Sequence, residues 1–241
     1  MAKRIWLIIG ILVLLVGAGL FIFRKSKKPM PPPRVAKNSP RPAGLAGNGG
    51  FNWDDRGNLI VNGSFETPEI PPLKPGELPK VLWDRATADE MKPWETDGEN
   101  FEIWANGLTM PRGNATVKIT PVKSAVGNQN IEIISDPIMG DNGWKMTGAV
   151  WQTVKTTPGT SYEFSFFHSE RPGAHSTLTV SLNSNIIAQI KEDGTQYGTL
   201  YWEQFETNFV ADSTNTTVKF SDETDVLGQG THLDGVLLRW E

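Results

Sequence analysis

From residue 58 to its end, the chain consists of short runs of alternating apolar and polar residues separated by turn-forming residues. Alternation with a period of two places every second side chain on one face, as in a half-buried β-strand. Tyr162, Phe164 and Phe166, for example, share one face of the segment 161–168. No stretch after residue 24 has sustained helical periodicity, although a helical turn or two is expected within 83–91. The pattern predicts an all-β fold. We expect strands at 59–65, 94–104 (with a hairpin turn at 95–98), 115–119, 130–134, 149–154, 161–168, 177–182, 186–190, 201–211, 217–220 and 233–240.

An apolar run without charged residues, Ile5 to Phe23, precedes this region. In a helix, at about 1.5 Å per residue, it spans a bilayer core of roughly 30 Å. The alternative is a cleaved signal peptide with its cleavage site at Val16-Gly17-Ala18, but the apolar run continues beyond that site. We therefore expect an uncleaved transmembrane helix at 5–23, preceded by a short basic tail at 1–4.

The segment 24–50 is basic and rich in proline, and then in glycine. Its first half favours a stiff polyproline spacer and its second half a flexible one. Simple disorder is the alternative, and either structure would act as a stalk. The remaining residues, 51–241, are expected to form one β-sandwich domain.

The charge is divided between the two ends of the chain. Nine of the 23 Lys and Arg residues lie in the first 41 positions, which contain no Asp or Glu. The other 14 basic side chains face 27 acidic ones, a net charge of −13. An acidic domain argues against nucleic acid as a partner, because phosphates require a basic surface. The chain contains no cysteine, which excludes disulfides and thiolate metal sites.

Three segments carry a resemblance to a known fold. Residues 58–66 read Asn-Leu-Ile-Val-Asn-Gly-Ser-Phe-Glu, and residues 231–238 read Thr-His-Leu-Asp-Gly-Val-Leu-Leu. Residues 148–166 read Gly-Ala-Val-Trp-Gln-Thr-Val-Lys-Thr-Thr-Pro-Gly-Thr-Ser-Tyr-Glu-Phe-Ser-Phe. Over about 58–240 the chain resembles the galactose-binding-like jelly roll of carbohydrate-binding modules and related cell-surface proteins. The resemblance implies a jelly-roll β-sandwich, although the proline-rich insertion at 67–93 departs from the usual compact first connection.

The resemblance also implies a metal site. In similar modules a Glu from the first strand and an Asp from the last strand share a structural calcium ion, and these positions correspond to Glu66 and Asp234 here. Calcium requires six to eight oxygen ligands, which two carboxylates and neighbouring backbone carbonyls can supply. The alternative is that both carboxylates cap turns or pair with basic side chains.

Aromatic side chains are the candidates for a sugar-binding surface, since a pyranose ring stacks on a flat aromatic ring while polar side chains bind its hydroxyl groups. Strand parity predicts that Trp151, Phe167 and Trp202 point outward, with Phe167 extending a platform begun by Trp151. Trp144 lies in a glycine-rich loop. For each of them the alternative is a packing role. We expect three other tryptophans in the core: Trp94, Trp104 and Trp240.

The segment from His168 to His175 is polar and separates two expected strands. Glu170 and Arg171 within it are candidates for contacts with sugar hydroxyls. The two histidines suit a transition metal, but no third ligand follows at a diagnostic spacing. A solvated hairpin end is the alternative.

No nucleophile elbow, phosphate-binding loop or histidine-rich metal motif is present. We therefore predict a membrane-anchored, non-catalytic carbohydrate-binding module that recognises a glycan or polysaccharide at a cell or particle surface. One alternative is a structural surface or virion protein whose jelly roll contacts other proteins, and another is a glycoside hydrolase-like enzyme. The fold resemblance favours an extracytoplasmic domain on a single-pass protein, whereas the basic residues after the apolar run favour the opposite orientation.

Overall fold

The computed structural model describes residues 57–70, 84–98, 100–108, 121–133, 147–224 and 228–241. Within these ranges the chain forms strands and turns but no helix. The strands are β1 (Asp84–Thr87), β2 (Glu95–Thr96), β3 (Asn100–Ala105), β4 (Gln129–Glu132), β5 (Thr147–Lys155), β6 (Ser161–Glu170), β7 (His175–Leu182), β8 (Asn185–Asp193), β9 (Glu203–Val210), β10 (Asn215–Thr224) and β11 (Thr231–Trp240).

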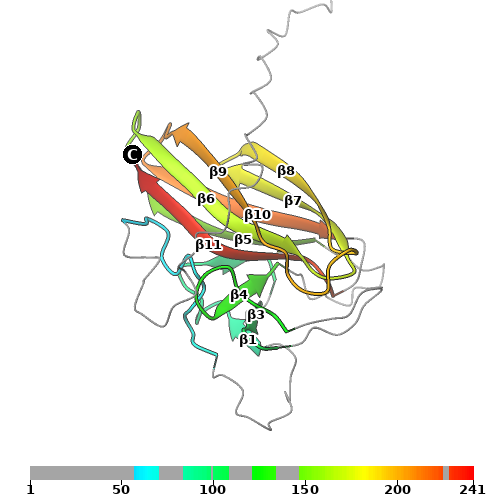
Figure 1. The fold of residues 1–241 in the computed structure, drawn as a ribbon. Helices are drawn as coiled ribbons and strands as arrows, with labels where there is room; N and C mark the ends of the chain where they lie inside the picture. Colours follow the sequence, from blue (N-terminus) through cyan, green and yellow to red (C-terminus); the bar gives the residue numbers. More distant parts are fainter. Residues whose placement is uncertain (1–56, 71–83, 99, 109–120, 134–146, 225–227) are drawn as a thin grey trace, which may run out of the picture. The chain divides into compact units, whose positions relative to one another are not determined.

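The strands form two antiparallel sheets (Figure 1). One has six strands in the order β1-β3-β4-β11-β6-β9, and the other has five in the order β2-β5-β10-β7-β8. The expected all-β sandwich is thus confirmed. Within the described ranges no helix has the length and hydrophobicity of a membrane span, and the apolar run 5–23 lies outside those ranges.

The core lies between the two sheets and contains the residues that the alternation places inward. Phe164 and Phe166 of β6 are fully buried and contact Phe220 of β10, with ring centroids 6.2 and 4.9 Å apart. Trp94, as predicted, is also fully buried here, 6.5 Å from Phe220. Burial of such side chains is worth about 1.5–3 kcal/mol each, so this aromatic cluster joins the sheets firmly.

The predicted opening strand, 59–65, is a series of turns instead of a strand. Asn62 and Phe65 have positive φ angles, 54° and 55°, which interrupt an extended backbone. Side chains then satisfy the backbone groups that a strand ladder would have paired. The Asn58 amide exchanges hydrogen bonds with the backbone of β11, and the Gln152 amide of β5 exchanges two with Val61. The segment therefore connects both sheets.

The expected hairpin turn at 95–98 is also wrong, because β2 and β3 belong to different sheets. The described part of 83–91 forms β1 and then hydrogen-bonded turns, in which the Met91 N–H donates to the Thr87 carbonyl four residues earlier, as in a single helical turn. Trp240, predicted to be in the core, is 58% exposed because it is the last residue of β11, at the end of the sheet. The expected strand 115–119 and the domain boundary at 50/51 lie outside the described residues.

One side of the sandwich is formed by two edge strands that follow each other in the chain. β8 is at the edge of the five-stranded sheet and β9 at the edge of the six-stranded sheet. Residues 194–202 connect them and therefore cross from one sheet to the other (Figure 1). This connection carries the candidate site.

Candidate functional site

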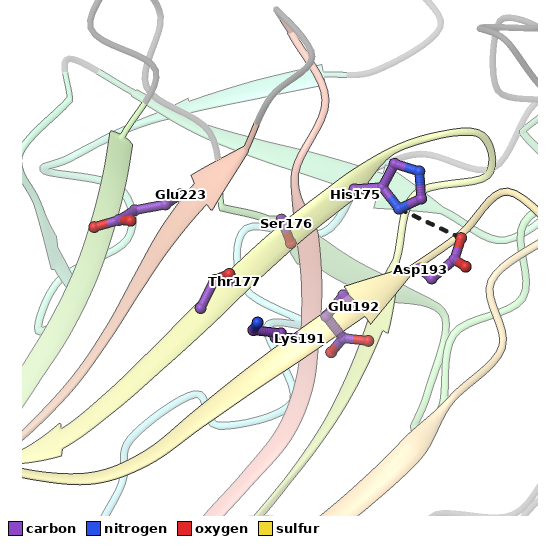
Figure 2. A pocket seen from close by; sticks show the side chains of 7 residues that line it. All are labelled: His175, Ser176, Thr177, Lys191, Glu192, Asp193 and Glu223. Carbon is purple, nitrogen blue, oxygen red and sulfur yellow. Dashed lines mark ion pairs between the residues drawn. The ribbon is translucent and has the colours of Figure 1, made fainter.

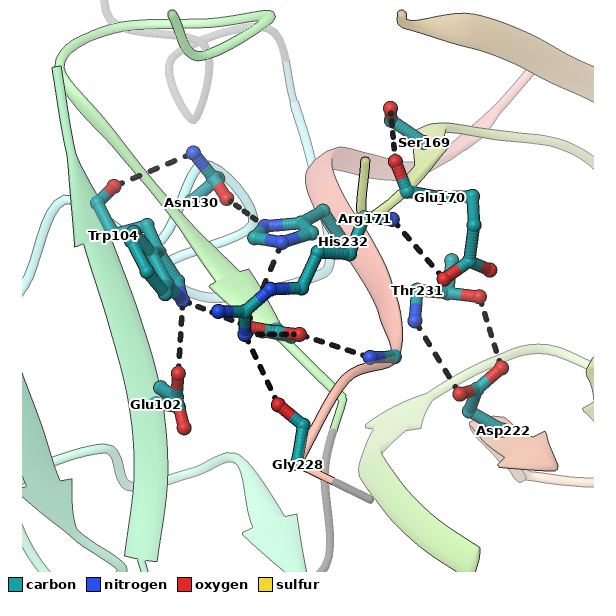
Figure 3. Close-up of polar contacts among 12 residues, drawn as sticks. Glu102, Trp104, Asn130, Ser169, Glu170, Arg171, Asp222, Gly228, Thr231 and His232 are labelled. Carbon is teal, nitrogen blue, oxygen red and sulfur yellow. Dashed lines mark hydrogen bonds and ion pairs between the residues drawn. The ribbon is translucent and has the colours of Figure 1, made fainter. Parts of the chain in front are cut away.

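The outward face of the six-stranded sheet carries a buried charged network (Figure 3). Glu102, Glu132 and His232 are neighbours across β3, β4 and β11. Arg171, from the β6–β7 connection, donates from Nη1 to both oxygens of Glu132 at 3.0 and 2.9 Å. Its guanidinium lies 5.1 Å from the ring centroid of Trp104, a tryptophan that is fully buried as predicted. Arg171 is 4% exposed and paired, so it is not the solvated hydroxyl contact that we expected.

The pKa values of this network indicate a structural role. Burial, reinforced by the charge of Glu132, raises the pKa of Glu102 to about 9. Burial opposes ionisation of Glu132 too and is the largest single effect, but the charge of the Arg171 guanidinium, the nearby His232 and hydrogen bonds from Arg171 and the Gly230 N–H together outweigh it and lower the pKa of that carboxyl. Burial lowers the pKa of His232 to about 4. At neutral pH the network therefore holds one ion pair, Glu132 with Arg171, beside a protonated Glu102 and a neutral His232.

Glu170, predicted as a second hydroxyl contact, is 4% exposed at the end of β6. Its carboxyl accepts hydrogen bonds from the hydroxyl of Ser176 and the backbone N–H of Arg171. Burial raises its pKa to about 8. The segment 168–175 is thus mostly buried, and the expectation of a solvated hairpin end is wrong. Glu170 still lines a pocket, described below.

Glu66 and Asp234 lie close together around one segment, 125–129, as the resemblance implied. Asp234 accepts from the backbone N–H groups of Val126 and Gly235 at 2.8 and 2.7 Å, and Glu66 accepts from Asn128 and Gln129 at 2.8 and 3.0 Å. Burial raises the pKa of Asp234 well above its usual range, and the charge of Glu66 adds to this.

The two carboxylates are oxygen donors of the kind that Ca²⁺ binds. A cation would also offset the cost of placing two carboxylates together, one of them buried. Glu66 and Asp234 therefore fit the implied ion, which would share their carboxylate oxygens with the N–H groups of segment 125–129.

Trp151 points outward from β5, while Val150 and Gln152 beside it are buried, as the parity predicted. It is half-buried, and the Nζ atom of Lys219 lies 5.4 Å from its ring centroid. Phe167 points outward from β6, in the other sheet. The two rings therefore lie on opposite faces of the sandwich, and the expected common platform does not form. Phe167 instead packs against a small cluster formed by Ala125, Val126 and Leu237.

Trp202 is half-buried beside Leu200 and donates from Nε1 to the Lys123 carbonyl at 2.7 Å. It packs against the cluster around Trp104 on the outward face of the six-stranded sheet. Part of its side chain remains accessible. Trp144 lies outside the described residues.

The β8–β9 connection presents an aromatic pair that the sequence analysis missed. Tyr197 and Tyr201 are 37% and 55% exposed, and their rings stack with centroids 4.6 Å apart and an interplanar angle of 3°. They line a pocket of about 190 Å³ together with polar side chains from β6, β8 and the start of β9. A signal was present: two of the three tyrosines in the chain lie four residues apart in a glycine-containing loop. The polar residues that line the pocket are Ser169, Glu170, Lys191, Glu192, Asp193 and Glu203.

A second, more open hollow of about 460 Å³ adjoins this pocket and shares Lys191, Glu192 and Asp193 with it (Figure 2). It lies along β7 and β8. His175 is exposed here, and its Nδ1 lies 3.5 Å from Asp193 Oδ1. The two hollows together form a polar surface next to the tyrosine pair.

The fold and the site define a class: a two-sheet antiparallel β-sandwich with an exposed aromatic pair beside a polar edge pocket. Residues 142–234 match a family that is described only as proteins of unknown function (DUF642). No curated protein matches the chain.

Several solved structures resemble the chain, and those named here are carbohydrate-binding modules. TmCBM61, solved in complex with β-1,4-galactotriose, is 17% identical, with 76% of this chain and 99% of that chain covered and a TM-score of 0.45. The CBM22-1 xylan-binding domain from Paenibacillus barcinonensis is 12% identical, with 62% and 86% covered and a TM-score of 0.38. A family 35 module from Clostridium thermocellum is 12% identical, with 65% and 95% covered and a TM-score of 0.33.

Proposed function

We propose that this protein is a membrane-anchored, non-catalytic module that binds glycans through the pocket at the β8–β9 connection. The observation that carries the proposal is the exposed stack of Tyr197 and Tyr201 at the wall of a polar pocket. Ligand sites in proteins combine apolar or aromatic surface with a few converging polar groups, and this pocket has both.

The chemistry of the pocket suits a sugar. The free face or edge of a tyrosine ring can pack against the C–H face of a pyranose. Between two aromatic rings such a contact contributes about 0.5–1.5 kcal/mol beyond the burial of apolar area, and we expect a contribution of this order here. The carboxylates of Glu192, Asp193 and Glu203 accept hydrogen bonds from hydroxyl groups, and Lys191 donates them. A pocket of about 190 Å³ is small, so we expect one sugar unit in it and further units along the adjoining open hollow.

Three parts of this proposal rest on the sequence. The apolar run 5–23 supports a membrane anchor, and the resemblance to cell-surface modules supports an extracytoplasmic domain. The resemblance also supports a structural Ca²⁺ ion held by Glu66 and Asp234. Trp151 and the accessible part of Trp202 are proposed as secondary glycan contacts away from the pocket.

The test is a glycan array probed with the full chain in detergent micelles, followed by titration of the best glycan. Tyr201→Ala and Tyr197→Ala should each weaken binding by about tenfold, which corresponds to 1.4 kcal/mol. Trp240→Ala is the matched control. It removes an aromatic ring about as exposed as that of Tyr201, on the cross-strand neighbour of Tyr162 at the start of β6, whereas the pocket lies at the other end of that strand. Unchanged affinity in both tyrosine variants, or equal loss in the control, would refute this site.

A further inference from the structure

Three metal-ligating side chains from three strands meet beside the tyrosine pair. His168 of β6 and Glu203 of β9 are direct cross-strand neighbours within the six-stranded sheet. Glu192 belongs to β8, the edge strand of the other sheet, and its carboxylate contacts Nδ1 of His168. One ligand atom from each of the three lies within 4.8 Å of the other two. Glu192 and Glu203 lie 24 and 35 positions after His168 in the sequence, so only the fold brings the three residues together.

The ligand types select the class of metal. An imidazole nitrogen with two carboxylates is a common ligand set for Zn²⁺ and similar divalent transition metals, whereas Ca²⁺ and Mg²⁺ prefer oxygen ligands alone. Three protein ligands leave a coordination position for water or for a ligand. Small rotations of the two glutamates would suffice, because their oxygens already lie near the imidazole nitrogen.

The pocket lining contains more carboxylates than basic groups. Besides the ligands Glu192 and Glu203, it includes one further exposed carboxylate, Asp193, and one basic residue, Lys191. The side chains of His168 and Glu192 are only 5% and 9% exposed, so their contact is weakly screened by solvent. Glu203 is exposed and leaves the site open to entry.

We propose that His168, Glu192 and Glu203 bind one divalent transition-metal ion of the zinc class. The ion connects β9 and β6 to β8 and so closes the side of the sandwich at which the two edge strands meet. It also fixes both ends of the connection 194–202, which carries Tyr197 and Tyr201. The site is separate from Glu66 and Asp234, which lie around segment 125–129 and offer oxygen ligands only.

The test uses the full chain, purified in detergent without a polyhistidine tag and stripped with a chelator. Zn²⁺ should bind with a stoichiometry of one and raise the melting temperature, since an ion that binds only the folded state stabilises it. Co²⁺ in the same site should give a visible absorption band that reports nitrogen and oxygen ligation. Glu203→Gln should weaken Zn²⁺ binding at least about tenfold, because loss of even an outer partner of a metal ligand costs 10–100-fold.

The matched control is His175→Gln. It alters the other histidine–carboxylate pair of these strands, His175 with Asp193, whose side chains are about half exposed. We expect its zinc affinity to stay within about twofold of wild type. His168→Gln should abolish the Co²⁺ band. If that variant fails to fold, Glu203→Gln decides the question, since its side chain is exposed. Zinc binding that is absent in wild type, unchanged in Glu203→Gln or lost in His175→Gln would overturn the proposal.

Discussion

The ammonium group of Lys219 lies over the indole ring of Trp151, with Nζ 5.4 Å from the ring centroid, on the outward face of the five-stranded sheet. The two residues are direct neighbours across β10 and β5. A cation over an aromatic face competes with a sugar for that face. Trp151 therefore points outward, as a sugar platform must, but a sugar would have to displace Lys219 to reach it.

This arrangement predicts that Trp151 contributes less to glycan affinity than the tyrosine pair. Trp151→Ala should weaken glycan binding less than Tyr201→Ala, because stacking on Trp151 must first break its contact with Lys219. A double-mutant cycle between Trp151→Ala and Lys219→Ala should give a coupling free energy of about 0.5–1 kcal/mol in stability. Titration calorimetry and thermal unfolding measure the two effects. A larger loss of affinity for Trp151→Ala than for Tyr201→Ala would move the main site to the five-stranded sheet.

The buried carboxyl of Glu102 predicts a loss of stability at alkaline pH. Its pKa is about 9 in the folded protein, against an ordinary value of 4.5 in the unfolded chain. Between these values the unfolded chain binds fewer protons than the folded one, so the free energy of unfolding falls as the pH rises from about 5 to 9. Glu102→Gln cannot ionise and still offers an oxygen to Trp104 Nε1, which donates to Glu102 at 3.0 Å.

Glu102→Gln should therefore match the wild type near pH 5 and unfold at a higher denaturant concentration than the wild type near pH 9. Urea unfolding at several pH values checks this. Glu206→Gln, which changes an exposed residue of β9, serves as control and should leave the slope unchanged. If the wild type and Glu102→Gln lose stability in parallel, Glu102 is not the group that titrates.

Calcium should stabilise the domain through Glu66 and Asp234. An ion at a hundredfold excess over its Kd adds about 2.7 kcal/mol to the free energy of unfolding. EGTA should lower the melting temperature, and Ca²⁺ added back should restore it. Asp234→Ala and Glu66→Gln should both remove the response to Ca²⁺. Glu66→Gln should disturb folding less than Asp234→Ala, because Asp234 is fully buried whereas Glu66 is only half-buried. A wild type that responds to Zn²⁺ alone would contradict the calcium site.

The β-sandwich should fold without the first 50 residues, because all strands of the described part lie between 84 and 240. We expect residues 51–241, expressed alone, to unfold in one cooperative transition with the same midpoint as the full chain in detergent. Circular dichroism during heating measures this. A broad transition or an aggregated product would place the domain boundary elsewhere.

Much of the sandwich was predicted from the local alternation of apolar and polar residues. The alternation in 161–168 places Tyr162, Phe164 and Phe166 inward, and all three are buried. The same rule correctly turned Trp151 outward. The period of two works here because successive side chains in any strand point to opposite faces, whatever the strand pairs with. The resemblance that the segments 58–66 and 231–238 carry likewise predicted that Glu66 and Asp234 lie close together.

What covers an outward face was decided by the tertiary structure alone. Phe167 lies in β6 and Arg171 directly follows it, and parity or polarity suggested exposure for both. Ala125 and Val126 nevertheless pack against Phe167, and the network around Glu132 encloses Arg171. The convergence of His168 with Glu192 depends on two edge strands of different sheets meeting along one side. Alternation specifies which way a side chain points from its strand, but carries no information about which strand or loop lies opposite. That depends on how the sheets pair and pack, which the burial of the whole core determines.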